Sequence, residues 1–180
     1  MLCPPERIRT IHDTLAHRFG EAGIAVHSGK TKASNKAGIQ LPEIAELGGE
    51  EGAWRLDGII LLGTPIGTHA FTRDHAAARL REEQFFLDQL SALPDPQCAW
   101  QLFTRYAIPR GNYWLRTIPF PASLAYARSR DDAIWQSVLT ISRTESMPTN
   151  LKADGRKIAK LPSRMGGLGV RSAVLTAPAA

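Results

Sequence analysis

The stretch SGKT at residues 28–31 is the first place where this sequence could do chemistry, because Gly-Lys-Thr ends a phosphate-binding loop. Such a loop needs a glycine five residues before Gly29, so that successive backbone N–H groups can surround a phosphate. That position holds Ile24, and the nearest glycine, Gly23, comes one residue too early. The residues that follow also lack the apolar periodicity of a helix that would direct its N-terminus at the phosphate. We therefore do not expect a nucleotide-hydrolysing site at SGKT.

Two adjacent carboxylates, Asp131 and Asp132, have the residue type that holds two metal ions in polymerases and nucleases. Metal-binding aspartates of that kind need a strand or hairpin that holds them rigidly, whereas these two lie in a predicted helix. Arg128 and Arg130 flank them, so a charge network on the surface is the interpretation we favour. The five histidines show no metal-ligand spacing, and the two cysteines stand alone. The sequence therefore predicts no metal site and displays no complete active site.

Basic and aromatic side chains alternate in the stretch FTRYAIPRGNYWLRTIPF, residues 103–120. Arginines bind phosphates, and aromatic rings can stack on bases or sugars. The alternative is that the aromatic rings form the core of a helical bundle and that the arginines alone reach solvent. The arginines are Arg105, Arg110 and Arg116, and the aromatic residues are Phe103, Tyr106, Tyr113, Trp114 and Phe120.

The distribution of charge supports a polyanionic partner. The chain has a formal net charge of +5; residues 1–90 carry 10 Lys and Arg against 12 Asp and Glu, whereas residues 91–180 carry 12 against 5. A basic half of this kind most often indicates nucleic acid, and a basic surface without a partner is the alternative. The chain contains no apolar run of about 18 residues, and MLCPPERIRT has prolines and charges where a signal peptide is apolar. We expect no membrane contact and an intracellular protein, nuclear or cytoplasmic, that is not secreted.

Helices and strands that would position these residues follow from apolar periodicity, prolines and glycines. Asp95 and Pro96 predict a helix start, and Pro109 predicts its end. The predicted helices are 5–22, 69–93, 95–108 and 121–142, and 110–120 is either a short helix or an extended crossing. The predicted strands are 24–28 and 54–62, and we expect these two strands to pair with each other.

Four segments occur in the order that they have in non-LTR retrotransposon-type reverse transcriptases. AGIAVHSGKTKA resembles palm motif D, and GIILLGTPIG resembles motif E, the primer grip, usually Leu-Gly-x-Pro-Ile-Gly. LPDPQCAWQLFTRYAIPRGNYWLRTIP resembles the first thumb helices, and LPSRMGGLGVRSA resembles the segment after the thumb. The resemblance covers nearly the whole chain from about residue 20 onward.

This resemblance implies roles for named residues. Lys30 would reach the phosphates of the incoming nucleotide, as an electrostatic stabiliser or proton donor. The corner at 63–67 would be the tight hairpin that holds the primer end, with an ordinary strand-to-helix turn as the alternative. Its residues are Gly63, Thr64, Pro65, Ile66 and Gly67, and Arg105, Arg110 and Arg116 would follow the phosphates of the primer–template duplex.

The aspartates that hold Mg²⁺ in this family lie upstream of motif D, and nothing in residues 1–30 supplies them. We therefore expect part of a reverse transcriptase that does not polymerise alone, holds no cofactor itself, and works with an upstream palm and fingers if these are encoded. The alternative is a non-catalytic helical interaction module, or a degenerate retroelement remnant without a nucleic-acid role. The expected fold is α+β: a palm edge with a small antiparallel β element at 1–68, a helical thumb-like bundle at 69–160, and a Gly-rich connector with a helix start at 161–180.

Overall fold

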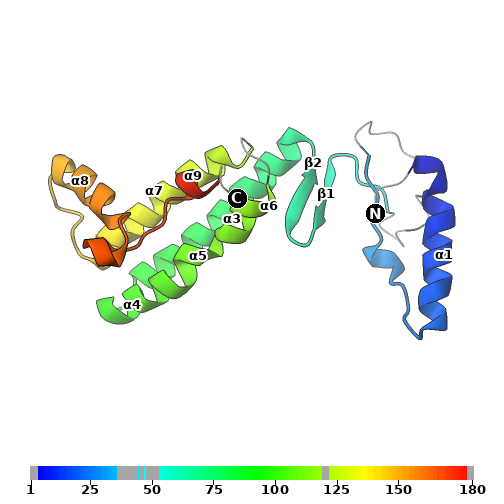
Figure 1. Cartoon of the computed structure of the whole chain (residues 1–180), viewed down its shortest axis with the longest axis horizontal. Helices are drawn as coiled ribbons and strands as arrows, with labels where there is room; N and C mark the ends of the chain where they lie inside the picture. The colour runs from blue at the N-terminus through cyan, green and yellow to red at the C-terminus, as the bar shows by residue number, and fades with distance from the viewer. Residues whose placement is uncertain (1–3, 36–43, 45–46, 48–52, 119–121, 178–180) are drawn as a thin grey trace. The chain divides into compact units, whose positions relative to one another are not determined.

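The computed structural model of the chain describes residues 4–35, 44, 47, 53–118 and 122–177. The described part is mostly helical and contains a two-stranded antiparallel sheet, which confirms the coarse α+β description. Contacts divide the chain into two units, Met1–Thr72 and Arg73–Ala180. Figure 1 shows the elements of both units. No helix among the described residues is long and apolar enough to cross a lipid bilayer.

The first unit begins with a single 3-10 turn, η1 (Pro5–Arg7), and the helix α1 (Ile8–Glu21), as the periodicity predicts. Gly23 ends the helix in the left-handed region, with φ of +74°. Its N–H donates to the Gly20 carbonyl at 3.0 Å, and the Ile24 N–H donates to the Phe19 carbonyl at 2.8 Å. These two bonds are those of a Schellman cap, in which glycine adopts the left-handed conformation without steric cost.

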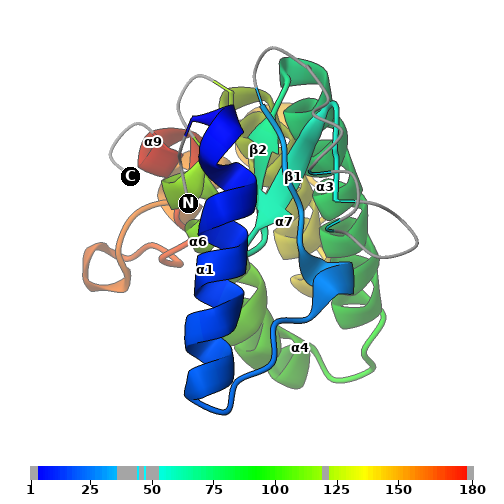
Figure 2. The ribbon, with the colours of Figure 1, turned by 90° about the vertical axis from the view of Figure 1, so that its right-hand side faces the viewer.

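The strand predicted at 24–28 is wrong. The chain turns back after α1 without regular structure and forms the single 3-10 turn η2 (Ser28–Lys30), as Figure 2 shows. Ile24 and Val26 are 57% and 40% exposed. A strand needs a hydrogen-bonded neighbour, and the segment predicted as its partner pairs elsewhere. An isolated parallel bridge joins Ala33 to Trp54 instead.

The strand predicted at 54–62 is shorter than expected and pairs with the residues directly after it. Strand β1 (Gly58–Leu61) and strand β2 (Thr64–Gly67) form an antiparallel hairpin in which Ile59 faces Ile66. The hairpin of β1 and β2 closes a loop of two residues, whereas pairing of β1 with 24–28 would close a much longer loop. The hairpin therefore costs less conformational entropy. Of residues 36–52, which precede this hairpin in the sequence, the structure describes Ile44 and Leu47.

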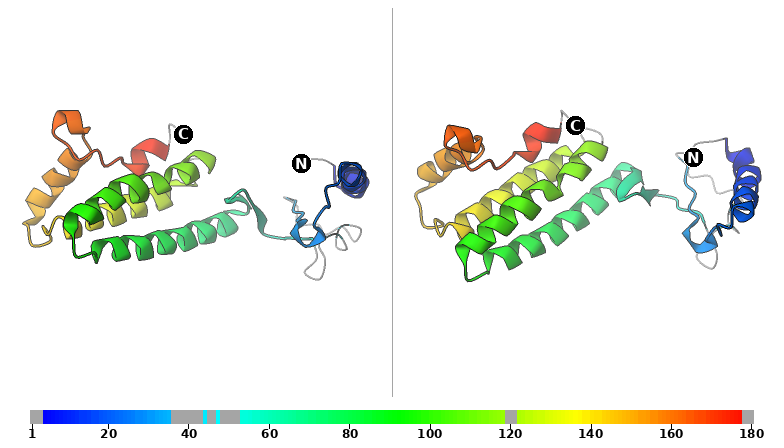
Figure 3. Two further views of the ribbon diagram at one scale, coloured as in Figure 1. Left: turned by 90° about the horizontal axis from the view of Figure 1, so that it is seen from below. Right: turned by 60° about the horizontal axis from the view of Figure 1, so that its bottom comes forward.

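Three helical segments form most of the second unit. Helix α3 (His69–Ser91) starts in the last residues of the first unit and runs on into the second. The chain then reverses into a nearly continuous helical run, namely α4 (Pro96–Leu102), the π-helical turn η4 (Phe103–Ala107), α5 (Ile108–Arg110) and α6 (Asn112–Thr117). It reverses again into α7 (Leu124–Ile141), and the three segments lie side by side in Figures 1 and 3.

The predicted start of α4 is confirmed, but its predicted end is wrong. The Asp95 carboxylate accepts hydrogen bonds from the N–H groups of Gln97 and Cys98, and Pro96 occupies the first turn. At Pro109 the helix continues, because the preceding turn is π-helical: the Ile108 N–H donates to the Phe103 carbonyl, five residues back. This change of register places Pro109 in the first turn of α5, where its missing N–H is tolerated.

The remaining elements are α8 (Thr149–Ala159), the 3-10 turn η5 (Ser163–Met165) and the short helix α9 (Ala173–Thr176). The buried apolar side chains of the second unit form two clusters. One cluster contains Leu87, Phe103, Ile134 and Val138 with Val170 from the C-terminal segment. The other contains Trp114, Leu115, Tyr126 and Ala127 with Ala173 and Ala177. The segment 161–177 therefore adds buried side chains to both clusters.

Candidate nucleic-acid interface

The outer face of the α4–α6 run carries alternating aromatic and basic side chains. Tyr106, Arg110 and Tyr113 follow each other at spacings of four and three residues, which places them on one side of a helix. Tyr106 is 60% exposed and Tyr113 is 50% exposed. Arg116 follows three residues later and is also exposed. The helical run thus presents phenol rings and guanidinium groups to solvent along one line.

The inner face of the same run is part of the core. Phe103 is fully buried and Trp114 is 3% exposed, so these two rings pack in the two apolar clusters. Trp114 also packs 5.3 Å from the ring of Tyr126, measured between centroids. The bundle-core interpretation is therefore correct for Phe103 and Trp114 and wrong for Tyr106 and Tyr113, and Phe120 lies outside the described residues.

The arginines of this face differ in their surroundings. The Arg110 guanidinium lies 5.2 Å from the centroid of the Phe86 ring, a cation–π contact that holds it against α3. Arg105 and Arg116 are exposed and make no hydrogen bond or ion pair with any residue that the structure describes. Such cations are available to a phosphate, because no partner has to be released first.

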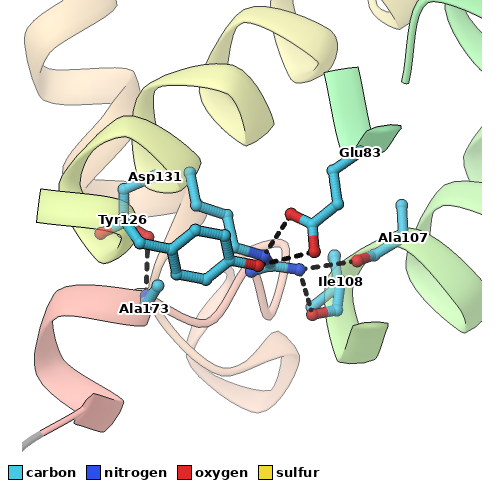
Figure 4. Close-up of polar contacts among 7 residues, drawn as sticks. Glu83, Ala107, Ile108, Tyr126, Asp131 and Ala173 are labelled. Carbon is cyan, nitrogen blue, oxygen red and sulfur yellow. Dashed lines mark hydrogen bonds and ion pairs between the residues drawn. The ribbon is translucent and has the colours of Figure 1, made fainter. Parts of the chain in front are cut away.

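A buried ion pair fixes the backbone beneath this face. Arg130 of α7 donates from Nε to the Glu83 carboxylate of α3 at 3.1 Å, and their side chains are 3% and 12% exposed. The Tyr126 hydroxyl donates to the other oxygen of Glu83 at 2.6 Å, and Figure 4 shows the two side chains meeting. Burial raises the pKa of the Tyr126 phenol, and the adjacent Glu83 carboxylate raises it further. The phenol therefore stays protonated and serves as a donor.

Arg130 also connects this pair to the helical run. Its Nη2 donates to the carbonyls of Ala107 and Ile108, at 2.8 Å and 3.0 Å, where the run changes from π- to α-helical bonding. Gly111 makes this approach possible, because a Cβ there would lie 2.3 Å from Arg130 Nε. Arg130 thus anchors Ala107 and Ile108, which precede Arg110, to α3 and α7.

The adjacent aspartates have separate structural roles. The predicted surface charge network is wrong for Asp131, whereas Asp132 does lie in a surface ion pair, although not with Arg128 or Arg130. Asp131 is buried and accepts hydrogen bonds from the Ser172 hydroxyl and, at 2.6 Å, from the Ala173 N–H. Asp132 is exposed and pairs with Arg156 at 2.7 Å. Among the described residues, no group of three His, Cys, Asp or Glu side chains could hold a metal ion.

The predicted primer-grip residues form the second strand of the β1–β2 hairpin and one position of its turn. Leu62 and Gly63 occupy the two-residue turn with φ of +51° and +81°, as a type I′ turn requires. Pro65 is buried, whereas Ile66 is 50% exposed. The close approach of the two strands requires a glycine at position 67, since a Cβ there would lie 2.2 Å from the Asp57 carbonyl oxygen.

Lys30 is exposed at the end of η2, and its N–H donates to the His27 carbonyl at 3.0 Å. Lys30 and the hairpin belong to the first unit, whereas Arg105, Arg110 and Arg116 belong to the second. The sequence analysis did not single out Glu83 and assigned Arg130 to a surface charge network, so it missed the buried pair that they form. Both residues occupy positions within apolar stripes, Glu83 between Leu80 and Leu87 and Arg130 between Ala127 and Ile134. A charged residue in such a stripe is a signal that could have identified the pair.

The chain was also compared with known proteins. No family model, no curated protein and no solved structure matches it.

Proposed function

We propose that this chain is part of a reverse transcriptase and that it binds the backbone of a primer–template duplex with the outer face of its α4–α6 run. The observation that carries the proposal is the exposed line of Tyr106, Arg110 and Tyr113, with Arg105 and Arg116 beside it. Guanidinium groups on a rigid helix contact phosphates, and phenol rings between them can stack on bases or sugars.

The polymerase origin rests on the order of the four resembling segments. The tight hairpin at GIILLGTPIG is consistent with a primer-grip role, and its tip exposes Leu62 at 85%. The resemblance assigns Lys30 to the incoming nucleotide and the α3–α7 bundle to the thumb. In this proposal the upstream palm of the parent enzyme supplies the aspartates that hold Mg²⁺.

We expect no nucleotide incorporation by the chain alone on a primed RNA template with Mg²⁺ or Mn²⁺. Asp131, the buried member of the aspartate pair, already accepts bonds from Ser172 and Ala173 on its two oxygens. Metal-dependent primer extension that disappears when Asp131 and Asp132 are replaced by Asn would contradict this expectation.

The binding test uses the whole chain and a short fluorescent duplex, either RNA–DNA or DNA of the same sequence. Anisotropy is measured from about 50 mM to about 200 mM salt, a range in which phosphate contacts weaken steeply. The triple variant Arg105→Gln, Arg110→Gln, Arg116→Gln should bind more weakly. On DNA, its slope of log affinity against log salt should be less negative by about 0.9 for each phosphate that the variant no longer neutralises.

A matched triple variant in and beside α1, Arg7→Gln, Arg9→Gln, Arg18→Gln, removes the same formal charge from the first unit. It should leave the slope unchanged. Equally weakened binding in both triple variants would mean that binding depends on net charge and not on this face. If the unaltered chain bound neither duplex, the proposal would fail and the non-catalytic interaction module would be the better interpretation.

A further inference from the structure

An apolar cavity of about 510 Å³ lies in the second unit, away from the Tyr106–Tyr113 face. Its walls come from α4, α7 and α8 and from the loop between α7 and α8. The residues that decide its chemistry are Trp100, Trp135, Leu139, Met147, Leu151 and Lys152. Figure 3 shows the start of α4 and the α7–α8 connection at the same end of the helical unit.

The connection between α7 and α8 keeps the cavity open. Arg143 follows α7 with φ of +57°, and the Thr144 N–H donates to the Leu139 carbonyl at 2.9 Å, so the chain turns sharply away. Ala159, at the far end of α8, is the buried residue of that helix. Near its start, Leu151 lines the cavity and is 48% exposed. Helix α8 therefore meets the core at its end and leaves apolar space near its beginning.

A single glycine faces the cavity from α8. A Cβ at Gly155 would lie 3.6 Å from the Trp135 ring, which is an ordinary van der Waals distance. A helix interior favours alanine over glycine by about 0.5–1 kcal/mol, and alanine would fit here. A longer side chain at this position would extend into the cavity, which makes Gly155 a suitable site for filling it.

The charges around the cavity favour an anionic ligand. Among the described residues, no acidic side chain lines the cavity. Lys152 is the cation in the cavity wall, and its Nζ donates to the Glu145 main-chain oxygen at 2.5 Å. An ammonium group has three donors, so this bond holds the amine in place and leaves donors for a ligand.

The volume of the cavity, about 510 Å³, is that of a small-molecule site. Ligand pockets hold about 300–1,000 Å³ and are mostly apolar with a few placed polar groups, as this cavity is. A single acyl chain is an apolar ligand that suits a site of this size and lining.

We propose that this cavity binds a single-chain amphiphile with a carboxylate head, such as a fatty acid. The acyl chain lies against the Trp100 and Trp135 rings, and the carboxylate pairs with Lys152. This site is separate from the proposed nucleic-acid interface, so the two proposals can fail independently.

The test uses the tryptophans of the whole chain as reporters and bromododecanoate as the probe, because bromine quenches indole fluorescence on contact. We expect saturable quenching that is reduced in Trp135→Phe. Gly155→Leu should weaken binding about ten-fold or more, since its side chain takes the place of the acyl chain. Gly20→Leu, at a helical glycine of α1 with open space around it, should leave binding unchanged.

A second variant tests the head group without changing the cavity. Lys152→Met should weaken binding of dodecanoate about ten-fold, because it removes a charge-assisted hydrogen bond, and should leave binding of the neutral dodecanol unchanged. The Arg105→Gln, Arg110→Gln, Arg116→Gln variant should bind dodecanoate as the unaltered chain does. Non-saturable quenching, equal quenching in Gly155→Leu, or equally weakened binding of dodecanoate and dodecanol in Lys152→Met would overturn the proposal.

Discussion

Helices α1 and α7 have similar sequence patterns, with apolar residues at spacings of three and four, yet they bury very different amounts of side chain. None of the 14 residues of α1 is buried, and Leu15 and Phe19 on its apolar stripe are 40% and 42% exposed. Helix α7 buries nine of its 18 residues, and three of these, Arg130, Asp131 and Ser137, are polar or charged. Periodicity therefore shows that a helix has a face to bury, whereas the surrounding elements decide how much is buried.

The two units also differ in how many of their described side chains are buried. In the first unit, the apolar cluster found among the described residues is small and contains Ile44, Leu47 and Ala53. The second unit has two larger apolar clusters, and it also buries the Glu83–Arg130 pair, each charge of which has hydrogen-bond partners. We expect the second unit to resist denaturation more strongly than the first, and the variants below test this difference.

Removal of the Glu83 carboxylate should give the largest effect. Glu83→Ala leaves Arg130 buried without its counter-ion, which typically costs about 3–5 kcal/mol. Its sequence neighbour Glu82 makes an exposed pair with Arg79, so Glu82→Ala should cost less than about 1 kcal/mol. Urea denaturation followed by circular dichroism compares the two variants. Similar midpoints would mean that the pair does not hold the second unit together.

Glycine-to-alanine changes should have opposite signs in the two units. Gly111→Ala places a methyl group on the Arg130 guanidinium and should destabilise the second unit by about 1–3 kcal/mol. Gly20→Ala adds a methyl group in open space within α1 and should stabilise that helix by about 0.5–1 kcal/mol. Thermal denaturation measures both changes, and a stabilising Gly111→Ala would contradict the packing described for Arg130.

High pH should weaken the second unit through Tyr126. The pKa of this phenol is raised in the folded chain by burial and by Glu83, so above about pH 10 the unfolded chain releases a proton that the folded chain retains. The stability due to this group is complete below that pH and falls as the pH rises. Tyr126→Phe should cost about 1 kcal/mol at neutral pH and should flatten the fall in stability at high pH. Denaturant midpoints measured across this range test both effects.

Substitutions in the hairpin turn of the first unit should have the smallest effect on stability. Leu62 adopts a left-handed conformation that costs most non-glycine residues about 1 kcal/mol, whereas asparagine accepts it more readily. Leu62→Asn should therefore slow amide exchange in β1 and β2, while Leu62→Val should speed it. The α7 amides should exchange slowly in all three proteins. Slower exchange in the hairpin than in α7 of the unaltered chain would reverse the contrast between the units.

Sequence patterns predicted the parts of this protein that depend on neighbouring residues. Pro5 and Gly23 marked the two ends of the first helical stretch, and Asp95 and Pro96 marked the start of α4, because caps act on the backbone within one turn. The aromatic residues of 103–120 were identified as candidates, but the sequence did not decide which of them face solvent. The π-helical turn decides which of them face solvent. It allows the helix to continue past Pro109, and it thereby determines that Tyr113 lies on the outer side of the run and Trp114 on the inner side.

Local sequence patterns were enough to predict the helical periods, the caps and the excess of basic residues in the second half. The tertiary structure decided that 24–28 has no strand partner, that Glu83 and Arg130 meet across 47 positions, and that Asp131 holds Ser172 and Ala173. It also decided that α8 leaves a cavity beside Trp100 and Trp135. The physical reason is the same in each case. A local pattern fixes the conformation of a segment, whereas burial of a charge, pairing of a strand and closure of a cavity depend on groups that are distant in the sequence.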